Sequence, residues 1–181
     1  MEKLLFVIHK HQATALHYDF RIQVGKSMPS WAIPRGPTLD PKFKRLSVKV
    51  NDHSLDYRNF EGNLPEGSVG AGPVMIWDEG YYIPEVEVGP QERKLIKDLD
   101  EGNQVMKDGI KKGEIKFFLH GKKIKGSFAL VKTKNFPPGS TKDNWLLIKH
   151  KDEYCKDDYD AKDEDFSARS GKSLEEIRNA T

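Results

Sequence analysis

An unbroken alternation of side chains from residue 16 to residue 24 is the feature that most constrains the fold of this chain. Apolar or aromatic side chains occupy every second position, and polar side chains fill the positions between them. A helix would spread both kinds around its surface, whereas a strand separates them onto two faces. The stretch therefore predicts a half-buried β-strand. Its apolar face would carry Leu16, Tyr18, Phe20, Ile22 and Val24, and its polar face His17, Asp19, Arg21 and Gln23.

Other stretches of strand length predict that most of the chain is β-structure. A hairpin turn is expected at residues 78–80, and Leu46, Val48 and Val50 alternate with polar residues in another strand. About eight strands predict a mainly β fold, a compact closed or nearly closed barrel. The further predicted strands are residues 4–8, 30–33, 45–51, 74–77, 81–83, 114–119, 125–132 and 145–149.

Two regions depart from this β pattern. Residues 89–113 predict a short helical insertion, with helical stretches at 91–99 and 104–112. Residues 151–181 hold 6 basic and 10 acidic residues, against 24 and 18 in the first 150. We therefore divide the chain into a barrel domain, 1–150, and a charged C-terminal arm, 151–181, which is either ordered on the barrel or a mobile linker. Ser173 and Glu176 predict a capping box at the start of a short helix in this arm.

Composition narrows the class of protein. No run of about 18 apolar residues exists, so no transmembrane helix is expected. The apolar run near the N-terminus is too short for a secretory signal, and the single cysteine, Cys155, excludes an internal disulfide framework. These features favour a cytoplasmic protein. The basic body is compatible with nucleic acid, and equally with an ordinary solvated surface.

The polar face of the strand at 16–24 carries a pattern that suggests chemistry. Residues two apart in a strand point the same way, roughly 7 Å apart, so His17, Asp19 and Arg21 form a row. A turn over residues 12–15 can bring His11 back beside His17. Two imidazoles and a carboxylate suit Mn²⁺, Zn²⁺ or Fe²⁺, and the guanidinium of Arg21 suits a phosphate. The alternative is a solvated polar face without a ligand.

Weaker candidates lie outside this row. His53 could donate a hydrogen bond or a proton to a phosphate oxygen, and Tyr57 could add a phenol donor. Arg35 and Arg45 are candidate contacts to a nucleic-acid backbone, or simply exposed solubilising residues. The glycines of residues 66–72 lack the context of a phosphate-binding loop and are expected to form tight turns.

Several motifs in order resemble those of the 3′-phosphoesterase domain of bacterial DNA ligase D and its stand-alone relatives. The resemblance spans residues 4–150 nearly throughout. The motifs are HQATALHYDFR (11–21), WAIPRGP (31–37), DHSLDY (52–57), FEG (60–62), GAG (70–72), GEIKF (113–117) and WLLIK (145–149).

The resemblance implies a manganese-dependent enzyme on a β-barrel, with Zn²⁺ or Co²⁺ as alternative metals. The implied reactions remove a 3′-terminal ribonucleoside and then the remaining 3′-phosphate, leaving a 3′-OH during DNA end repair by non-homologous end joining. The implied partners are 3′ ends of DNA or of RNA/DNA primer-templates and a ligase, polymerase or end-binding protein on a separate chain. By residue-wise match, His11, His17 and Asp19 are the metal ligands, His17, Arg21, His53 and Tyr57 are catalytic, and Arg21, Arg35, Arg45, His9 and Asn51 are near the substrate.

Two of these positions depart from the family pattern. His9 stands where relatives often have Gln, and Asn51 stands where they often have Glu. Both changes leave the row of His17, Asp19 and Arg21 intact, and they bear on the balance between the two implied reactions.

Two other functions fit the same residues. The sequence His17-x-Asp19 with a distant histidine also fits the two-histidine, one-carboxylate site of a non-haem iron oxygenase. A non-catalytic nucleic-acid-binding barrel, with its histidines as structural polar groups, is the second alternative.

Overall fold

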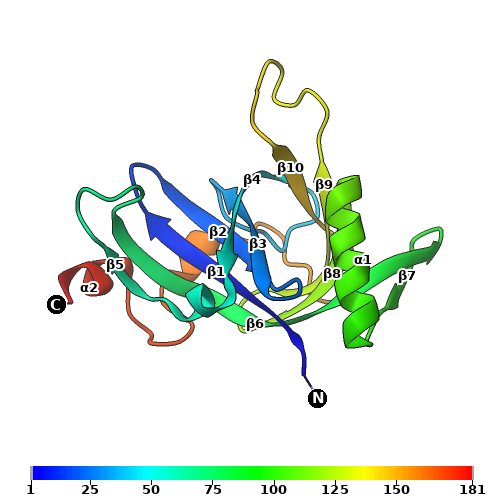
Figure 1. The fold of residues 1–181 in the computed structure, drawn as a ribbon, viewed down its shortest axis with the longest axis horizontal. Coiled ribbons are helices and arrows are strands. Elements are labelled where there is room, and N and C mark those ends of the chain that lie inside the picture. Colours follow the sequence, from blue (N-terminus) through cyan, green and yellow to red (C-terminus); the bar gives the residue numbers. More distant parts are fainter. Residues whose placement is uncertain (1, 181) are drawn as a thin grey trace.

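The computed structural model of the chain describes residues 2–180 and contains a closed antiparallel barrel (Figure 1). Its strands follow the order β1-β2-β3-β4-β10-β9-β8-β6, and β6 pairs back onto β1 to close the sheet. The predicted closed barrel of about eight strands is therefore confirmed. The strands are β1 (Leu4–Gln12), β2 (Leu16–Ile22), β3 (Ser27–Ile33), β4 (Arg45–Ser54), β6 (Gly72–Gly89), β8 (Glu114–Gly121), β9 (Lys125–Lys132) and β10 (Asn144–Lys149).

Smaller elements decorate this barrel. Two short strands, β5 (Gly62–Leu64) and β7 (Glu92–Leu95), pair with β6. Helix α1 (Leu99–Lys112) begins where the Asp98 side chain accepts a hydrogen bond from Glu101 N, and ends at Gly113 in the left-handed conformation. The remaining elements are η1 (Leu55–Asn59), η2 (Ala161–Glu164) and α2 (Leu174–Asn179).

Aromatic side chains fill the barrel, and the alternation in β2 is what directs them inward. Tyr18, Phe20 and Ile22 are buried, as predicted from the alternation. The Phe20 ring stacks on Phe117 from the opposite wall, with 5.5 Å between centroids. Because these side chains take the inward face of β2, its polar residues must lie on the outer face.

Two structural predictions made from the sequence are wrong. Residues 78–80 do not form a hairpin turn, because β6 runs through them without a break. The buried Asp78 carboxylate accepts backbone N–H groups of residues 122–124, so it caps a neighbouring turn instead. The helix predicted at 91–99 is also wrong, because β7 turns back after Gln91, at φ 59°, and pairs with β6.

Strand β4 turns its polar residues toward the interior. Ser47 is fully buried, and the Lys49 ammonium lies 5.2 Å from the Trp31 ring centroid. The alternating leucine and valines of this strand are only half-buried, on the outer face. Arg45 lies on the same face as Ser47 and Lys49, so it also points to the inner side, opposite Leu147. Hydrophobicity alone would have predicted the reverse, with the leucine and valines facing inward.

The C-terminal arm, residues 151–180 of the described chain, is ordered on the barrel (Figure 1). Its helix α2 contacts both β6 and β5. Tyr159 and Ile177 are buried in the main core. The Trp77 indole donates to Glu164 O at 2.8 Å. Ser173 and Glu176 form the predicted capping box. Within residues 2–180, no helix has the length and apolar character needed to cross a membrane.

Candidate metal and phosphate site

The antiparallel pairing of β1 with β2 brings the first two predicted ligands together. His11 lies directly opposite His17, and His9 opposite Asp19. The His11 and His17 rings meet edge to face, with 5.0 Å between centroids. His11, His17 and Asp19 can each offer one ligand atom, and these atoms all lie within 4.8 Å of one another. The turn after β1 therefore folds back as the spacing predicted.

Backbone carbonyls fix the orientation of both imidazoles. The Gly70 carbonyl lies 2.6 Å from His11 Nε2, and the Ala15 carbonyl lies 2.9 Å from His17 Nδ1. A carbonyl oxygen only accepts, so each of these ring nitrogens carries the proton, and a neutral ring leaves its other nitrogen as a lone-pair donor. Such a bond from the far nitrogen is the usual support of a metal-binding histidine.

The unprotonated nitrogen of His17 then faces a carboxylate. His17 Nε2 lies 3.2 Å from Asp19 Oδ2, and both atoms are acceptors when His17 is neutral. Only a proton or a cation between them makes this contact favourable. Accordingly, the hydrogen bond with Asp19 raises the pKa of His17. Burial opposes ionisation of Asp19, yet His17 and Arg21 outweigh it and hold the pKa of Asp19 below its usual range.

His11 has the opposite shift. Its burial lowers its pKa, which favours the neutral form that a metal requires. Two imidazole nitrogens and one carboxylate oxygen thus converge, and a divalent cation can use all three once His17 is neutral. The donor set fits such a cation on its chemistry, and it leaves further coordination positions for water or substrate.

Arg21 lies beside these donors and is held on several sides. Its Nη2 donates to Asp19 Oδ2 at 3.2 Å, its Nη1 to Ser30 Oγ at 3.1 Å, and its Nε to His9 Nδ1 at 3.0 Å. The Tyr57 ring covers the guanidinium at 5.1 Å. Only 4% of the side chain is exposed, so a full positive charge is held rigidly beneath the surface.

His9 lies behind Arg21 rather than at the surface. Its side chain accepts from Arg21 Nε with one nitrogen and donates to Phe60 O with the other, at 3.0 Å. Burial, followed by the charge of Arg21, lowers the pKa of His9 to about 3. A permanently neutral imidazole with both nitrogens engaged can orient Arg21 but has no free polar atom for a substrate.

His53 and Tyr57 complete the cluster from β4 and η1. His53 Nδ1 lies 3.1 Å from Arg21 Nη1 and 3.0 Å from Asn51 O. One nitrogen cannot accept from a guanidinium and donate to a carbonyl at once, so these contacts belong to two tautomers of the ring. Burial and the Arg21 charge lower the pKa of His53. The Tyr57 ring packs against His53 with 4.9 Å between centroids.

Three predicted residues do not join the cluster through their side chains. Asn51 is exposed and contributes its backbone carbonyl. Arg45 lies on the inner side of β4, against the Phe43 ring at 5.9 Å. Arg35 is exposed in the loop after β3, and burial followed by the charge of Arg35 lowers the pKa of Arg45, so the two arginines lie near each other.

Residues that the sequence analysis did not select also contribute. Ser30 lies opposite Arg21 in the β2–β3 pairing, and its hydroxyl accepts from the guanidinium. The carbonyls of Phe60 and Gly70 orient His9 and His11. The glycine loop does form tight turns, with positive φ at Gly67 and Gly70, but it also covers His11. Strand pairing could have revealed Ser30, whereas backbone carbonyls leave no signal in a sequence.

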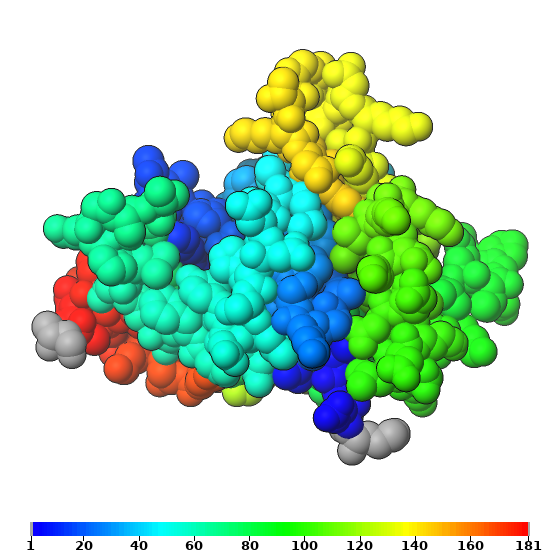
Figure 2. Space-filling view, in the orientation of Figure 1, coloured from blue at the N-terminus to red at the C-terminus, as the bar shows by residue number. Residues whose placement is uncertain are grey.

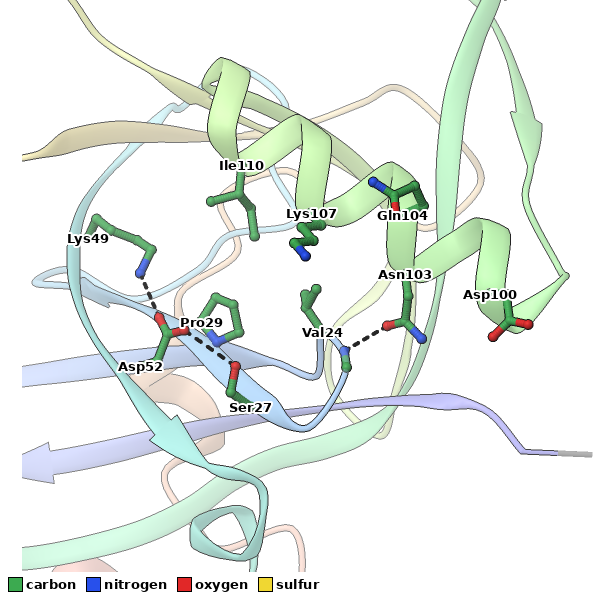
Figure 3. Close-up of a pocket in the computed structure, with 11 residues that line it drawn as sticks. Val24, Ser27, Pro29, Lys49, Asp52, Asp100, Asn103, Gln104, Lys107 and Ile110 are labelled. Carbon is green, nitrogen blue, oxygen red and sulfur yellow. Dashed lines mark hydrogen bonds and ion pairs between the residues drawn. The ribbon is translucent and has the colours of Figure 1, made fainter.

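The surface is hollowed between β4 and the loop that follows β5 (Figure 2). A separate cavity of about 580 Å³ lies between α1 and strands β3 and β4 (Figure 3). It contains none of the predicted site residues, and its Lys49 and Lys107 are balanced by Asp52 and Asp100. The candidate ligands His11, His17 and Asp19 are thus at the end of β1 and the beginning of β2, not in this cavity.

Comparison with known proteins agrees with the motifs. A family model for the DNA Ligase D 3'-phosphoesterase domain matches residues 9–132. The Multifunctional non-homologous end joining protein LigD of Pseudomonas aeruginosa is 40% identical over 149 residues, 82% of this chain and 15% of that protein. The protein of the same name from Mycolicibacterium smegmatis is 35% identical over 162 residues, 90% of this chain and 18% of that protein.

A third relative is the Multifunctional non-homologous end joining DNA repair protein LigD of Mycobacterium tuberculosis, 33% identical over 148 residues. The chain spans 15–18% of the length of these three relatives. The family match includes every one of the His11, His17, Asp19, Arg21, His53 and Tyr57 positions. On these matches, the chain belongs to the DNA ligase D 3′-phosphoesterase domain family.

Proposed function

We propose that this protein is a divalent-metal-dependent phosphoesterase that trims 3′ ends of DNA. It would remove a 3′-terminal ribonucleoside by phosphodiester cleavage, and a 3′-phosphate by phosphomonoester cleavage, to leave a 3′-OH. The family supports a phosphoesterase acting on DNA ends. The observation that carries the metal requirement is the contact of His17 Nε2 with Asp19 Oδ2, two acceptors that need a positive charge between them.

The proposed metal ligands are His11, His17 and Asp19, with Mn²⁺ as the preferred ion and Zn²⁺ or Co²⁺ as alternatives. A divalent cation bound there would act as a Lewis acid on a phosphoryl oxygen. Arg21, fixed by its four hydrogen-bond partners, would stabilise the negative charge that develops on the phosphate. No reorganisation is needed at the moment of reaction because the guanidinium is already oriented.

His53 is the proposed proton donor to the leaving oxygen. In the protonated ring Nδ1–H donates to the Asn51 carbonyl, so Nε2 can give its proton to the leaving oxygen and the neutral ring that remains keeps the Nδ1 bond. Tyr57 holds the ring and shields the site, because it packs on both His53 and Arg21. Arg35 and Arg45 are proposed to contact the DNA backbone beyond the reacting end.

The deciding experiment uses a 5′-labelled DNA primer annealed to a template, ending either in one ribonucleotide or in a 3′-phosphate. We expect shortening or phosphate release with Mn²⁺ and neither with EDTA. Parallel measurement of oxygen consumption tests the oxygenase alternative. Primer binding without trimming in the presence of Mn²⁺, Zn²⁺ or Co²⁺ would instead support a non-catalytic binding barrel and overturn the proposal.

The family relatives are described as end-joining proteins, and we extend that process to this chain as part of the proposal. The expected partners are 3′ ends of DNA or of RNA/DNA primer-templates, and a ligase, polymerase or end-binding protein that acts on the trimmed end. A 3′-OH is the product that a ligase or polymerase needs.

A further inference from the structure

The C-terminal arm lies outside the residues matched by the family model, yet it contacts the segment that covers the site. Segment 59–63 joins η1, which carries Tyr57, to β5. Phe60 in this segment stacks on Tyr57 with 5.4 Å between centroids, and its carbonyl accepts from His9. The position of segment 59–63 therefore determines where Tyr57 and His9 sit against Arg21.

Three contacts from the arm hold this segment. Arg169 Nη2 donates to Asn59 Oδ1 at 3.2 Å, and Ser170 Oγ donates to Glu61 Oε2 at 2.5 Å. The Asn63 amide then donates to the carbonyls of Ile177 and Arg178 at the end of α2. Contacts at residues 59, 61 and 63 bracket Phe60 along the chain.

The arm is itself anchored to the barrel, so its contacts can fix the position of segment 59–63. Arg169 also makes a two-point ion pair with Glu79 of β6, with Nη2 2.6 Å from Oε1 and Nε 3.1 Å from Oε2. Ala168 N donates to Ile76 O, and Ser167 Oγ accepts from the backbone N–H groups of Arg169 and Ser170. The turn that presents Arg169 and Ser170 is thus fixed on both sides.

Glu61 links the same turn to the barrel wall. While one of its carboxylate oxygens accepts from Ser170, the other accepts from Ile76 N at 2.8 Å. The Ile76 carbonyl thus accepts a hydrogen bond from the arm, and the Ile76 N–H donates one to segment 59–63. Three pieces of chain far apart in sequence therefore meet at one residue of β6.

We propose that Arg169 and Ser170 of the C-terminal arm are positioning residues that hold segment 59–63, and with it Tyr57 and Phe60, against the Arg21–His9 pair. They act through Asn59 and Glu61 and do not touch the reacting atoms. The kinetic consequence rests on the proposed function, whereas the structural consequence does not.

The test compares the double variant Arg169→Ala/Ser170→Ala with Lys162→Ala, which removes an exposed basic side chain of the same arm. Aromatic ¹H–¹³C NMR spectra of the free protein report directly on the stacked rings. We expect the Tyr57 and Phe60 ring signals to shift and broaden in the double variant and to stay in place in Lys162→Ala. Unchanged ring signals in the double variant would overturn the inference.

The kinetic measurement uses the 3′-phosphorylated primer with Mn²⁺, well below the melting temperature of each variant. We expect kcat of the double variant to fall about tenfold with KM nearly unchanged, because orientation in the transition state is lost while binding of the DNA is kept. Ser170→Thr, which retains the hydroxyl, should keep full kcat. An unchanged kcat, or an equal fall in Lys162→Ala, would overturn the inference. Ring shifts in a protein that lacks activity even as wild type would instead refute the proposed function alone.

Discussion

Two buried polar clusters on this barrel contain the same kinds of side chain but differ in how their polar atoms are satisfied. In the first, His17 and Asp19 face each other with acceptor atoms. In the second, Ser127 Oγ of β9 donates to Glu85 Oε1 at 2.6 Å and lies 2.7 Å from His150 Nδ1. The serine hydroxyl thus bridges a carboxylate and an imidazole.

The second cluster is complete without any ligand. Asp152 accepts from Ser127 N and from Lys149 Nζ, the latter at 2.7 Å. One oxygen of Glu85 and both oxygens of Asp152 thus face a donor from the protein. In the first cluster Arg21 donates to Asp19, but neutral His17 has no donor between its free nitrogen and the same carboxylate, so the contact needs a proton or a cation, and the proposed metal would supply the latter. Histidine and carboxylate in proximity therefore indicate a metal site only when the hydrogen-bond donors have been counted.

The sharpest test of this difference is removal of one carboxylate charge from each cluster. We expect Asp19→Asn to lower Mn²⁺-dependent trimming about a thousandfold, or about 4 kcal/mol of transition-state stabilisation, because the cation loses its only anionic ligand. Glu85→Gln should change it less than about twofold. Trimming assays with Mn²⁺ titration, and Mn²⁺ binding measured by electron paramagnetic resonance, check both. Retention of metal binding by folded Asp19→Asn protein would remove Asp19 from the ligand set.

The second test replaces an arginine next to each cluster. Arg21→Lys keeps the charge but loses the planar fork that bonds Asp19, Ser30 and His9 together. We expect kcat to fall about a hundredfold, the usual effect of removing one oriented charge-stabilising group. Arg93→Lys, beside Glu85 at 3.9 Å, is the matched control and should leave kcat within about twofold. Equal kinetics for the two variants would show that Arg21 acts only in packing.

The sequence predicted the closed barrel and the inward face of β2, because strict alternation determines which side chains share a face. It also predicted the approach of His11 to His17, since the turn length sets the register of a hairpin. It predicted the strand at 45–51, which is β4, but it failed for residues 78–80. The Asp78 carboxylate is buried against the backbone N–H groups of residues 122–124, and local periodicity contains no information about such a distant partner.

Side chains of the candidate site could be predicted from the sequence, whereas the backbone groups that orient them could not. From the residues alone His53 and Tyr57 were weaker candidates, and the family motifs supplied their connection to the row, because β4 and η1 reach Arg21 only through long-range contacts. The locked state of His9 depends on Phe60 O, a backbone atom available at every position of any sequence. The Tyr57 ring that covers the Arg21 guanidinium likewise comes from η1 and not from β2.

A third test removes the bridging hydroxyl of the satisfied cluster. Ser127→Ala leaves the buried Glu85 and His150 without their shared partner, so we expect the free energy of unfolding to fall by about 1–3 kcal/mol with kcat unchanged. Ser30→Ala is the counterpart in the first cluster and should lower both stability and kcat, because it releases Arg21. Urea denaturation and trimming assays separate these effects. A kcat defect in Ser127→Ala would mean that the two clusters communicate.

The smallest expected effect concerns the pH dependence of the second cluster. Burial, with the charge of Arg93 next, lowers the pKa of His150 from 6.5 to about 4. As pH falls from 6.5 to about 4 the unfolded chain takes up this proton before the folded chain does, so unfolding becomes more favourable. His150 is partly exposed, which limits the loss to about 1 kcal/mol.

His150→Gln has no such proton to bind and should lose less stability than the wild type between pH 7 and pH 4.5, as measured by urea unfolding at several pH values. At pH 7 the variant should trim DNA at the wild-type rate, because the cluster has its own donors and takes no part in binding the cation. Identical pH dependence in the two proteins would show that His150 titrates in the folded state as it does in the unfolded chain. The second cluster would then owe its stability to Ser127 and Glu85 rather than to the neutral imidazole.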